Sequence, residues 1–244
     1  MRIAVVSDIH GNLTALEAVI ADLQQTAPDL ILHGGDLADA GARPVEILDR
    51  IRELGWRGVA GNTDEMLFRP ESLEEFASNS SAPPSLWAII REMARATRAM
   101  LGEERIERLR GLPSVQVQGA MTLVHASPES FWRAPTPEAT DAELRSVYGA
   151  LGQPIVAYGH IHRPYVRSLP SSQGQEIIVA NSGSVGLSYD GDCRASYLLL
   201  GSGNVTVRRV EYEVEKELQV LSTRDLPHAD WIARTLRAAS PQMP

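Results

Sequence analysis

The stretch IAVVSDIHG (residues 3–11) opens with four apolar residues and then places Asp8 and His10 two positions apart. An apolar run rich in β-branched residues is typical of a strand that is buried on both faces of a parallel sheet. Apolar residues then follow at positions 13, 16, 19, 20 and 23, and this helical spacing predicts a helix with one buried face. The stretch therefore predicts the first strand and helix of an α/β fold, with polar side chains at the carboxyl end of the strand.

The same order of elements repeats along the first sixty residues. Residues 30–32 predict a second buried strand that leads to Gly35-Asp36, and residues 56–60 predict a third strand that leads to Gly61-Asn62. Between them, Pro44 fits the first turn of an amphipathic helix. Strands and helices in this βαβαβ order imply a parallel sheet, whose functional loops gather at the carboxyl ends of the strands.

The rest of the chain divides into a helical middle and a strand-rich second half. Residues 66–112 show no strand pattern, predict helices over 86–100 and 103–109, and are interpreted as a helical cap-like insertion. Beyond it we expect strands over 115–117, 121–124, 155–158, 166–169, 176–180, 196–200 and 205–212, a helix over 138–151, turns over 171–174 and 201–204, and a helical tail over 213–244. This order predicts a single domain over residues 1–244, in which two packed sheets are flanked by helices.

Composition narrows the class of protein. The chain has 244 residues, 43% of them apolar, and a formal net charge of −8, which disfavours an extended nucleic-acid footprint because such binding needs a basic face. A single cysteine, Cys193, excludes an internal disulfide framework and a cysteine-rich zinc site. The sequence contains neither an apolar run of membrane-spanning length nor a signal-peptide pattern, so we expect a cytoplasmic protein with no membrane partner.

Seven oxygen and imidazole donors follow predicted strands directly. They are Asp8, His10, Asp36, Asn62, His125, His160 and His162. Residues two apart in extended backbone point to the same side, so the pair at 8 and 10 and the pair at 160 and 162 can each converge. Such a mixture suits Mn, Fe, Ni, Co or Zn better than calcium, and seven donors suit two divalent ions that share a carboxylate.

Each motif taken alone has a simpler explanation. A Gly-Asp pair such as Gly35-Asp36 is a common turn, Gly61-Asn62 fits a turn with asparagine in a left-handed conformation, and an isolated histidine such as His125 is more often structural. The metal hypothesis depends on the order of the motifs and on their shared position at strand ends.

In that order, Asp8-x-His10, Gly35-Asp36, Gly61-Asn62-x-Asp64, His125 and Gly159-His160-x-His162 resemble the motifs of the calcineurin-like metallophosphoesterases. The resemblance runs from residue 3 to residue 212 and is closest to the small bacterial and archaeal phosphodiesterase-like branch. The segment Asn181-Ser182-Gly183-Ser184-Val185-Gly186 is similar to a Gly-Ser turn of that branch.

The resemblance implies a fold and a metal centre. The fold would be a four-layer αββα double β-sandwich with a small helical insertion. One ion would take Asp8, His10, Asp36 and His162, and the second would take Asp36, Asn62, His125 and His160, with Asp36 as the bridge. A hydroxide between the ions would attack phosphorus, and Asp36, Asn62 and His125 are the residues expected to be catalytic.

The implied activity is hydrolysis of small phosphodiester or nucleotide-type substrates. Alternatives on the same site are a dinucleoside polyphosphate hydrolase and a phosphomonoesterase. A non-catalytic protein-interaction scaffold on this fold, like the related retromer subunit, is a third possibility, although a scaffold has no need of all seven ligands. The expected partner is a small phosphorylated substrate, and the sequence does not indicate the oligomeric state.

One position departs from the family pattern. Many members carry a histidine after the Gly-Asn pair, where this chain has Thr63, and a threonine hydroxyl is too weak an acid to protonate a leaving group. We therefore expect a substrate whose leaving group is already a weak base. Asn62, Thr63 and Arg133 are candidate substrate contacts, whereas His33, Trp87 and the pair Met93 and Met100 are expected to be structural.

Overall fold

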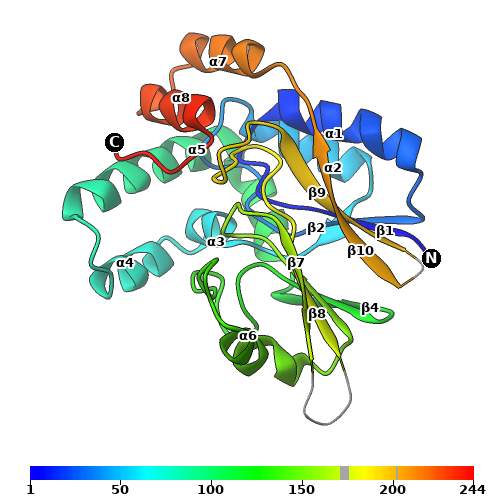
Figure 1. Cartoon of the computed structure of the whole chain (residues 1–244). Helices are drawn as coiled ribbons and strands as arrows, with labels where there is room; N and C mark the ends of the chain where they lie inside the picture. Colours follow the sequence, from blue (N-terminus) through cyan, green and yellow to red (C-terminus); the bar gives the residue numbers. More distant parts are fainter. Residues whose placement is uncertain (171–175, 202) are drawn as a thin grey trace.

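The first strand, β1 (Ile3–Val6), lies at the centre of a five-stranded mixed sheet with the order β10-β9-β1-β2-β3. Its neighbours are β2 (Leu30–His33), which is parallel to it, and β9 (Ala195–Gly201), which is antiparallel. The outer strands of this sheet are β3 (Arg57–Gly58) and β10 (Asn204–Val210). This computed structural model describes residues 1–170, 176–201 and 203–244 (Figure 1). The turn expected over 171–174 lies outside these residues, as does position 202 of the turn expected over 201–204.

A second mixed sheet packs against the first, as the sequence predicts. Its order is β4-β5-β6-β8-β7, with β4 (Val115–Gln118), β5 (Met121–Val124), β6 (Ile155–Tyr158), β7 (Tyr165–Leu169) and β8 (Ile177–Asn181). Alternation along β1 separates its side chains, since Ile3 and Val5 join Leu123 and Ala180 between the sheets. Ala4 and Val6 belong instead to the core beneath the helices.

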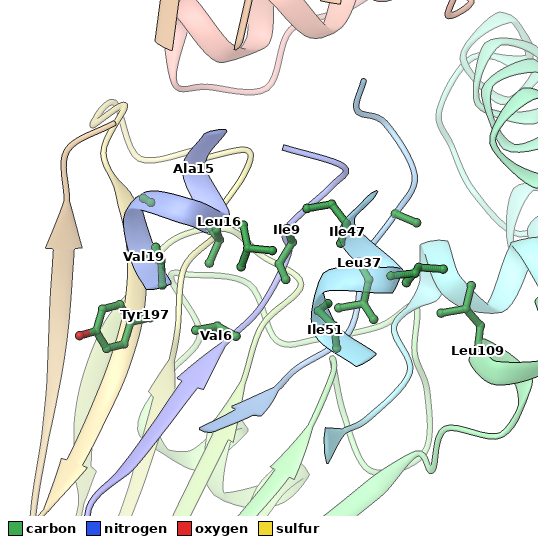
Figure 2. Packing of buried hydrophobic residues seen from close by; sticks show 14 of the residues in the cluster. Val6, Ile9, Ala15, Leu16, Val19, Leu37, Ile47, Ile51, Leu109 and Tyr197 are labelled. Atoms are coloured by element: carbon green, nitrogen blue, oxygen red, sulfur yellow. The ribbon is translucent and has the colours of Figure 1, made fainter. Parts of the chain in front are cut away.

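Helices cover the outer faces of both sheets, which confirms the four-layer α/β prediction. On the first sheet lie α1 (Leu13–Thr26) and α2 (Pro44–Glu53), and Figure 2 shows Leu16, Val19, Ile47 and Ile51 gathered around Val6. On the second lies α6 (Asp141–Tyr148), which is shorter than the expected helix over 138–151. Thr140 caps its first turn, and its last predicted residues form a 3-10 turn over Gly149–Leu151.

The middle segment is helical in the structure. It contains α3 (Asn62–Phe68), α4 (Glu71–Ser78) and α5 (Pro84–Arg110), which is broken at Gly102, where the backbone leaves helical geometry. The strand expected over 56–60 is shorter in the structure, because only Arg57 and Gly58 form strand pairs with β2. Val59 N–H still donates to His33 O at the end of β2, but Ala60 N–H donates to Pro113 O instead.

The tail forms α7 (Val214–Thr223) and α8 (Ala229–Ala238), which pack beside α5 (Figure 1). Met93 of α5 is buried among Ile232 and Leu236 of α8, whereas Met100 is 41% exposed, so the prediction of a core role fails for Met100. In the described part of the chain, none of the helices has both the length and the apolar character that a membrane crossing requires.

His33 ends β2 in a buried position, and burial lowers its pKa to about 4. An unfolded chain binds the proton near pH 6.5, so the stability that the neutral ring contributes is complete above that pH and is lost as the pH falls towards 4. We expect wild type to lose about 3 kcal/mol more than His33→Phe between pH 7 and pH 4. Urea unfolding at both pH values in the presence of a chelator measures this difference, and parallel losses in the two proteins would contradict the prediction.

Candidate metal centre

All seven predicted donors meet at one edge of the two sheets. Asp8 and His10 follow β1, Asp36 follows β2, Asn62 begins α3, His125 follows β5, and His160 and His162 follow β6. The expectation that Asn62 lies in a loop is wrong, because Asn62 and Thr63 occupy the first turn of a helix. That helix begins here since Asp64 accepts a hydrogen bond from the Gly61 N–H at 2.9 Å.

The first group of donors consists of Asp8, His10, Asp36 and His162, which are all buried. One potential ligand atom from each lies within 4.8 Å of the other three. His10 Nε2 is 3.2 Å from His162 Nε2, and His162 Nε2 is 3.1 Å from Asp8 Oδ1. Metal–ligand bonds of about 2.0–2.2 Å bring neighbouring ligand atoms to about 3–3.5 Å from one another, so these separations fit one ion.

The second group is built around Asn62. Its Oδ1 lies 3.0 Å from His125 Nε2 and 2.9 Å from His160 Nδ1, while His125 Nε2 is 3.5 Å from Asp36 Oδ2. The same Asp36 oxygen is 3.7 Å from His10 Nε2 in the first group. One carboxylate oxygen therefore faces both groups.

Hydrogen bonds to the backbone fix which histidine nitrogen faces the centre. Nδ1 of His10 contacts Asp39 O at 3.0 Å, Nδ1 of His125 contacts Gly34 O at 2.7 Å, and Nδ1 of His162 contacts Leu187 O at 2.5 Å. Because a carbonyl oxygen only accepts, each Nδ1 carries a hydrogen, and when the ring is neutral the Nε2 that faces the centre carries a lone pair. The lone pairs of His10 and His162 face each other, and a cation between them resolves this clash, so the residues fit a metal ion.

The protonation of the site also fits a cation. Burial disfavours the charged form of Asp36, but the charges of His125 and His10 hold the pKa of that carboxyl well below its usual range. Burial lowers the pKa of His160 to about 4. Burial acts in the same direction on His125, yet attraction to Asp36 raises its pKa to about 9. A proton is thus drawn to the space between Asp36 and His125, where a positive ion would stand.

Five of the seven donors have left-handed backbone. Asp8, His10, Asp36, His160 and His162 have φ between 48° and 68°. Non-glycine residues adopt this conformation at a cost, and such strain gathers at functional sites when the surroundings hold it in place.

Cross-links between loops hold that strained backbone. Asp8 N–H donates to Gly35 O and His10 N–H donates to Asp36 O, each at 3.0 Å. Backbone hydrogen bonds thus connect the loop after β1 to the loop after β2. Ser184 Oγ donates a hydrogen bond to Asp8 O at 2.7 Å, so the Gly-Ser turn also holds the backbone of the loop after β1.

Two of the glycines that directly precede a donor, Gly61 before Asn62 and Gly159 before His160, are required by the space around them. A side chain at Gly61 would collide with Asp36 Oδ1, and one at Gly159 would collide with Asp8 Oδ2. The glycines therefore permit the close approach of neighbouring loops that brings the ligands together.

Asp64 is a functional residue whose role the motif alone does not reveal. Its carboxylate accepts hydrogen bonds from the N–H groups of Asp36, Leu37 and Gly61 at 2.8–3.0 Å. Burial raises its pKa to about 7 and repulsion from Asp36 adds to the rise, although the N–H donors oppose it. Asp64 is thus a positioning residue that fixes the backbone of Asp36.

The candidate substrate contacts fall in different places. Asn62 and Thr63 line a cavity that opens on the donors, and Thr63 N–H donates to Asp36 Oδ1 at 2.9 Å. Arg133 lines a different cavity, and its guanidinium carbon lies 5.9 Å from the centre of the Phe76 ring.

Replacing Asp64 by asparagine should weaken metal binding by about 10–100-fold, because an amide NH₂ cannot accept from the N–H groups that position Asp36. Calorimetric titration with Mn²⁺ measures the affinity, and thermal unfolding in a chelator checks that the variant folds. Asp22→Asn is the matched control, since Asp22 bonds Tyr197 and Arg208 away from the donors. Wild-type affinity in a folded Asp64→Asn would contradict the role given to this residue.

Comparisons with known proteins agree with this geometry. The chain is 31% identical to the uncharacterized protein MJ0912 of Methanocaldococcus jannaschii in an alignment 252 residues long that covers 96% of each chain. It is 28% identical to a metallophosphoesterase from Sphaerobacter thermophilus, with a TM-score of 0.77 over 98% of this chain and 99% of the other. The hypothetical protein PH1004 of Pyrococcus horikoshii OT3 has the same fold, with a TM-score of 0.81 and 18% identity over 99% of both chains.

The model of the calcineurin-like phosphoesterase superfamily domain matches residues 1–202, which hold all seven donors and every strand of the two sheets except β10. This match covers far more than half of the chain. The chain therefore belongs to the calcineurin-like phosphoesterase superfamily.

Proposed function

We propose that this protein hydrolyses small phosphodiester or nucleotide-type substrates with two divalent ions bound at the paired donor groups. The observation that carries the proposal is the Asp36 carboxylate, whose Oδ2 faces donors of both groups while Oδ1 is bound by the Thr63 N–H. A shared carboxylate oxygen between two sets of ligands is the arrangement of two-metal hydrolytic sites. When bound, the ions supply positive charge against the phosphate oxygens and activate water at neutral pH.

The side chains have distinct tasks in this proposal. Asp8, His10 and His162 would hold one ion, and Asn62, His125 and His160 the other, so that Asp36 fixes their separation. His10, Asn62 and His160 also line the cavity, which lets a substrate reach both groups from one side. The buried Thr63 hydroxyl has no hydrogen-bond partner in the described part of the chain, and a phosphate or leaving-group oxygen would supply one.

Two alternatives are less well supported. A non-catalytic scaffold gains nothing from five strained ligands that are turned towards one another. A dinucleoside polyphosphate carries several charges, yet among the described residues no lysine or arginine lines the cavity beside the donors. A phosphomonoester fits the same donors, and the substrate panel below separates it from a diester.

The proposed setting is cytoplasmic, with a small phosphorylated molecule as the partner and neither an extended nucleic acid nor a membrane. The free thiol of Cys193 and the net charge of −8 are consistent with this proposal.

We expect chelator-treated protein to be inactive and to regain diester hydrolysis with Mn²⁺, Co²⁺, Ni²⁺, Zn²⁺ or Fe²⁺. A panel of bis(p-nitrophenyl) phosphate, p-nitrophenyl phosphate, cyclic nucleotides and dinucleoside polyphosphates identifies the preferred class. Asp36→Asn should lower kcat/KM by more than about 100-fold, because it removes the carboxylate shared by both groups, and Asp22→Asn should not. Protein that neither binds a transition metal nor cleaves any of these esters would overturn the proposal.

Thr63 provides a separate test of the leaving group. With no acid at this position, we expect wild type to prefer aryl phosphodiesters, whose leaving groups need no proton, over alkyl ones. Thr63→His should raise kcat/KM for the alkyl ester more than for the aryl ester, by up to about 100-fold if the imidazole is well placed. If the alkyl ester gains no more than the aryl ester, the absence of an acid does not explain the preference.

A further inference from the structure

The cavity beside the donors has walls that the metal chemistry does not require. Its volume is about 280 Å³, which is near the small end of the usual range for ligand pockets. His10, Asn62 and His160 form its polar floor, and the remaining lining is mostly aromatic and aliphatic. A phosphoryl group at the floor therefore leaves its organic substituent among apolar side chains.

The aromatic walls come from five separate segments. Phe76 lies on α4, Trp87 on α5, Trp132 after β5, Tyr189 after β8 and Trp231 on α8. The helical middle of the chain and the helical tail therefore both contribute aromatic side chains to the walls of this cavity.

Contacts between these rings hold them in place. Phe76 stacks on Trp132 with ring centres 4.9 Å apart and meets Trp87 edge-on at 5.7 Å. Trp132 Nε1–H donates to Glu65 Oε2 at 2.6 Å, and Tyr189 stacks on His162 at 4.3 Å. The walls are therefore aromatic surfaces that contacts with neighbouring side chains hold in position.

Charge excludes most other occupants. Among the described residues that line the cavity there is no lysine or arginine, so a second phosphate or a carboxylate inside it would meet no cation in the lining. A volume of about 280 Å³ also suits one ring system better than two nucleosides. The occupant is thus a single uncharged group attached to one phosphoryl group.

We propose that this cavity binds one flat, unsaturated ring carried by the phosphoester substrate, an aryl group or a single nucleobase, and thereby sets substrate specificity. The inference rests on the proposed function, because it assumes that the phosphoryl group binds at the donors. Aromatic side chains recognise flat rings through their faces and edges, which gives them a preference over saturated groups of the same size.

Trp87 is the wall best suited to a test. Its side chain is half-buried, and its Nε1–H has no hydrogen-bond partner in the part of the chain that the structure describes, so Trp87→Leu breaks no hydrogen bond there. Trp56 is a matched control, because it is also a half-buried tryptophan but lines a separate cavity beside His33.

The probes are methylphosphonate, cyclohexylphosphonate and phenylphosphonate, which share one anionic head and are not hydrolysed. Calorimetric titration into manganese-loaded protein gives their affinities. We expect wild type to bind phenylphosphonate about tenfold more tightly than methylphosphonate, and more tightly than cyclohexylphosphonate. Trp87→Leu should reduce the preference for phenylphosphonate by about threefold or more, while Trp56→Leu keeps it.

Each contrary outcome has a separate meaning. Equal binding of phenylphosphonate and methylphosphonate would overturn the inference and leave the proposed function standing. Equal binding of the phenyl and cyclohexyl probes would overturn recognition of a flat ring. A preference that survives Trp87→Leu would show that this cavity is not where the ring binds. If none of the three phosphonates binds in a manganese-dependent manner, the proposed function fails and this inference fails with it.

Discussion

The carboxylate of Asp36 is buried between two sets of donors, and its two oxygens have different contacts. Oδ1 accepts a hydrogen bond from the Thr63 N–H, while Oδ2 lies 3.5 Å from His125 Nε2 and 3.7 Å from His10 Nε2. A buried ionised carboxylate costs several kcal/mol unless positive charge and hydrogen bonds offset the lost hydration. The N–H of Asp36 is itself held by Asp64, so the compensation extends beyond the ligands. The position of this one oxygen decides whether the two donor groups form a single site.

That arrangement makes demands on the fold. Left-handed backbone at five of the donors is unfavourable, and it persists only where neighbouring segments leave no alternative. The parallel pairing of β1 with β2 provides this restraint, because it continues beyond the strands as hydrogen bonds between the loops that carry Asp8, His10 and Asp36. The apolar core between the sheets fixes the second set of loops relative to the first. The strand pairing and the apolar core that stabilise the sandwich thus also fix the geometry of the site.

Several of these features were accessible from the sequence and others were not. The apolar runs before Asp8, Asp36, His125 and His160 predicted strands with donors at their ends, because buried parallel strands have a strong local signature. The helix that begins at Asn62 was missed, since its start depends on a hydrogen bond between Asp64 and Gly61. The positioning role of Asp64 could not be predicted from the sequence either, because its hydrogen-bond partners are backbone groups on two separate loops. Trp87 was expected to be structural, and helical spacing gave no sign that it also borders a cavity shared with Trp132 and Trp231.

The cavity has a floor that holds the donor atoms and walls that determine its shape, and the two come from different parts of the molecule. Its floor comes from loops at the ends of sheet strands and from the first turn of α3, whose backbone is fixed by the neighbouring loops. Its walls come largely from α4, α5 and α8, and α5 packs against α8 through Met93, Ile232 and their neighbours. A substitution at Trp87 or Trp231 changes the shape of the cavity without touching a donor atom, whereas a change at Gly61 or Asp64 alters the ligands themselves. The physical separation of floor and walls allows substrate preference to change through the helices while the sheets continue to fix the position of Asp36.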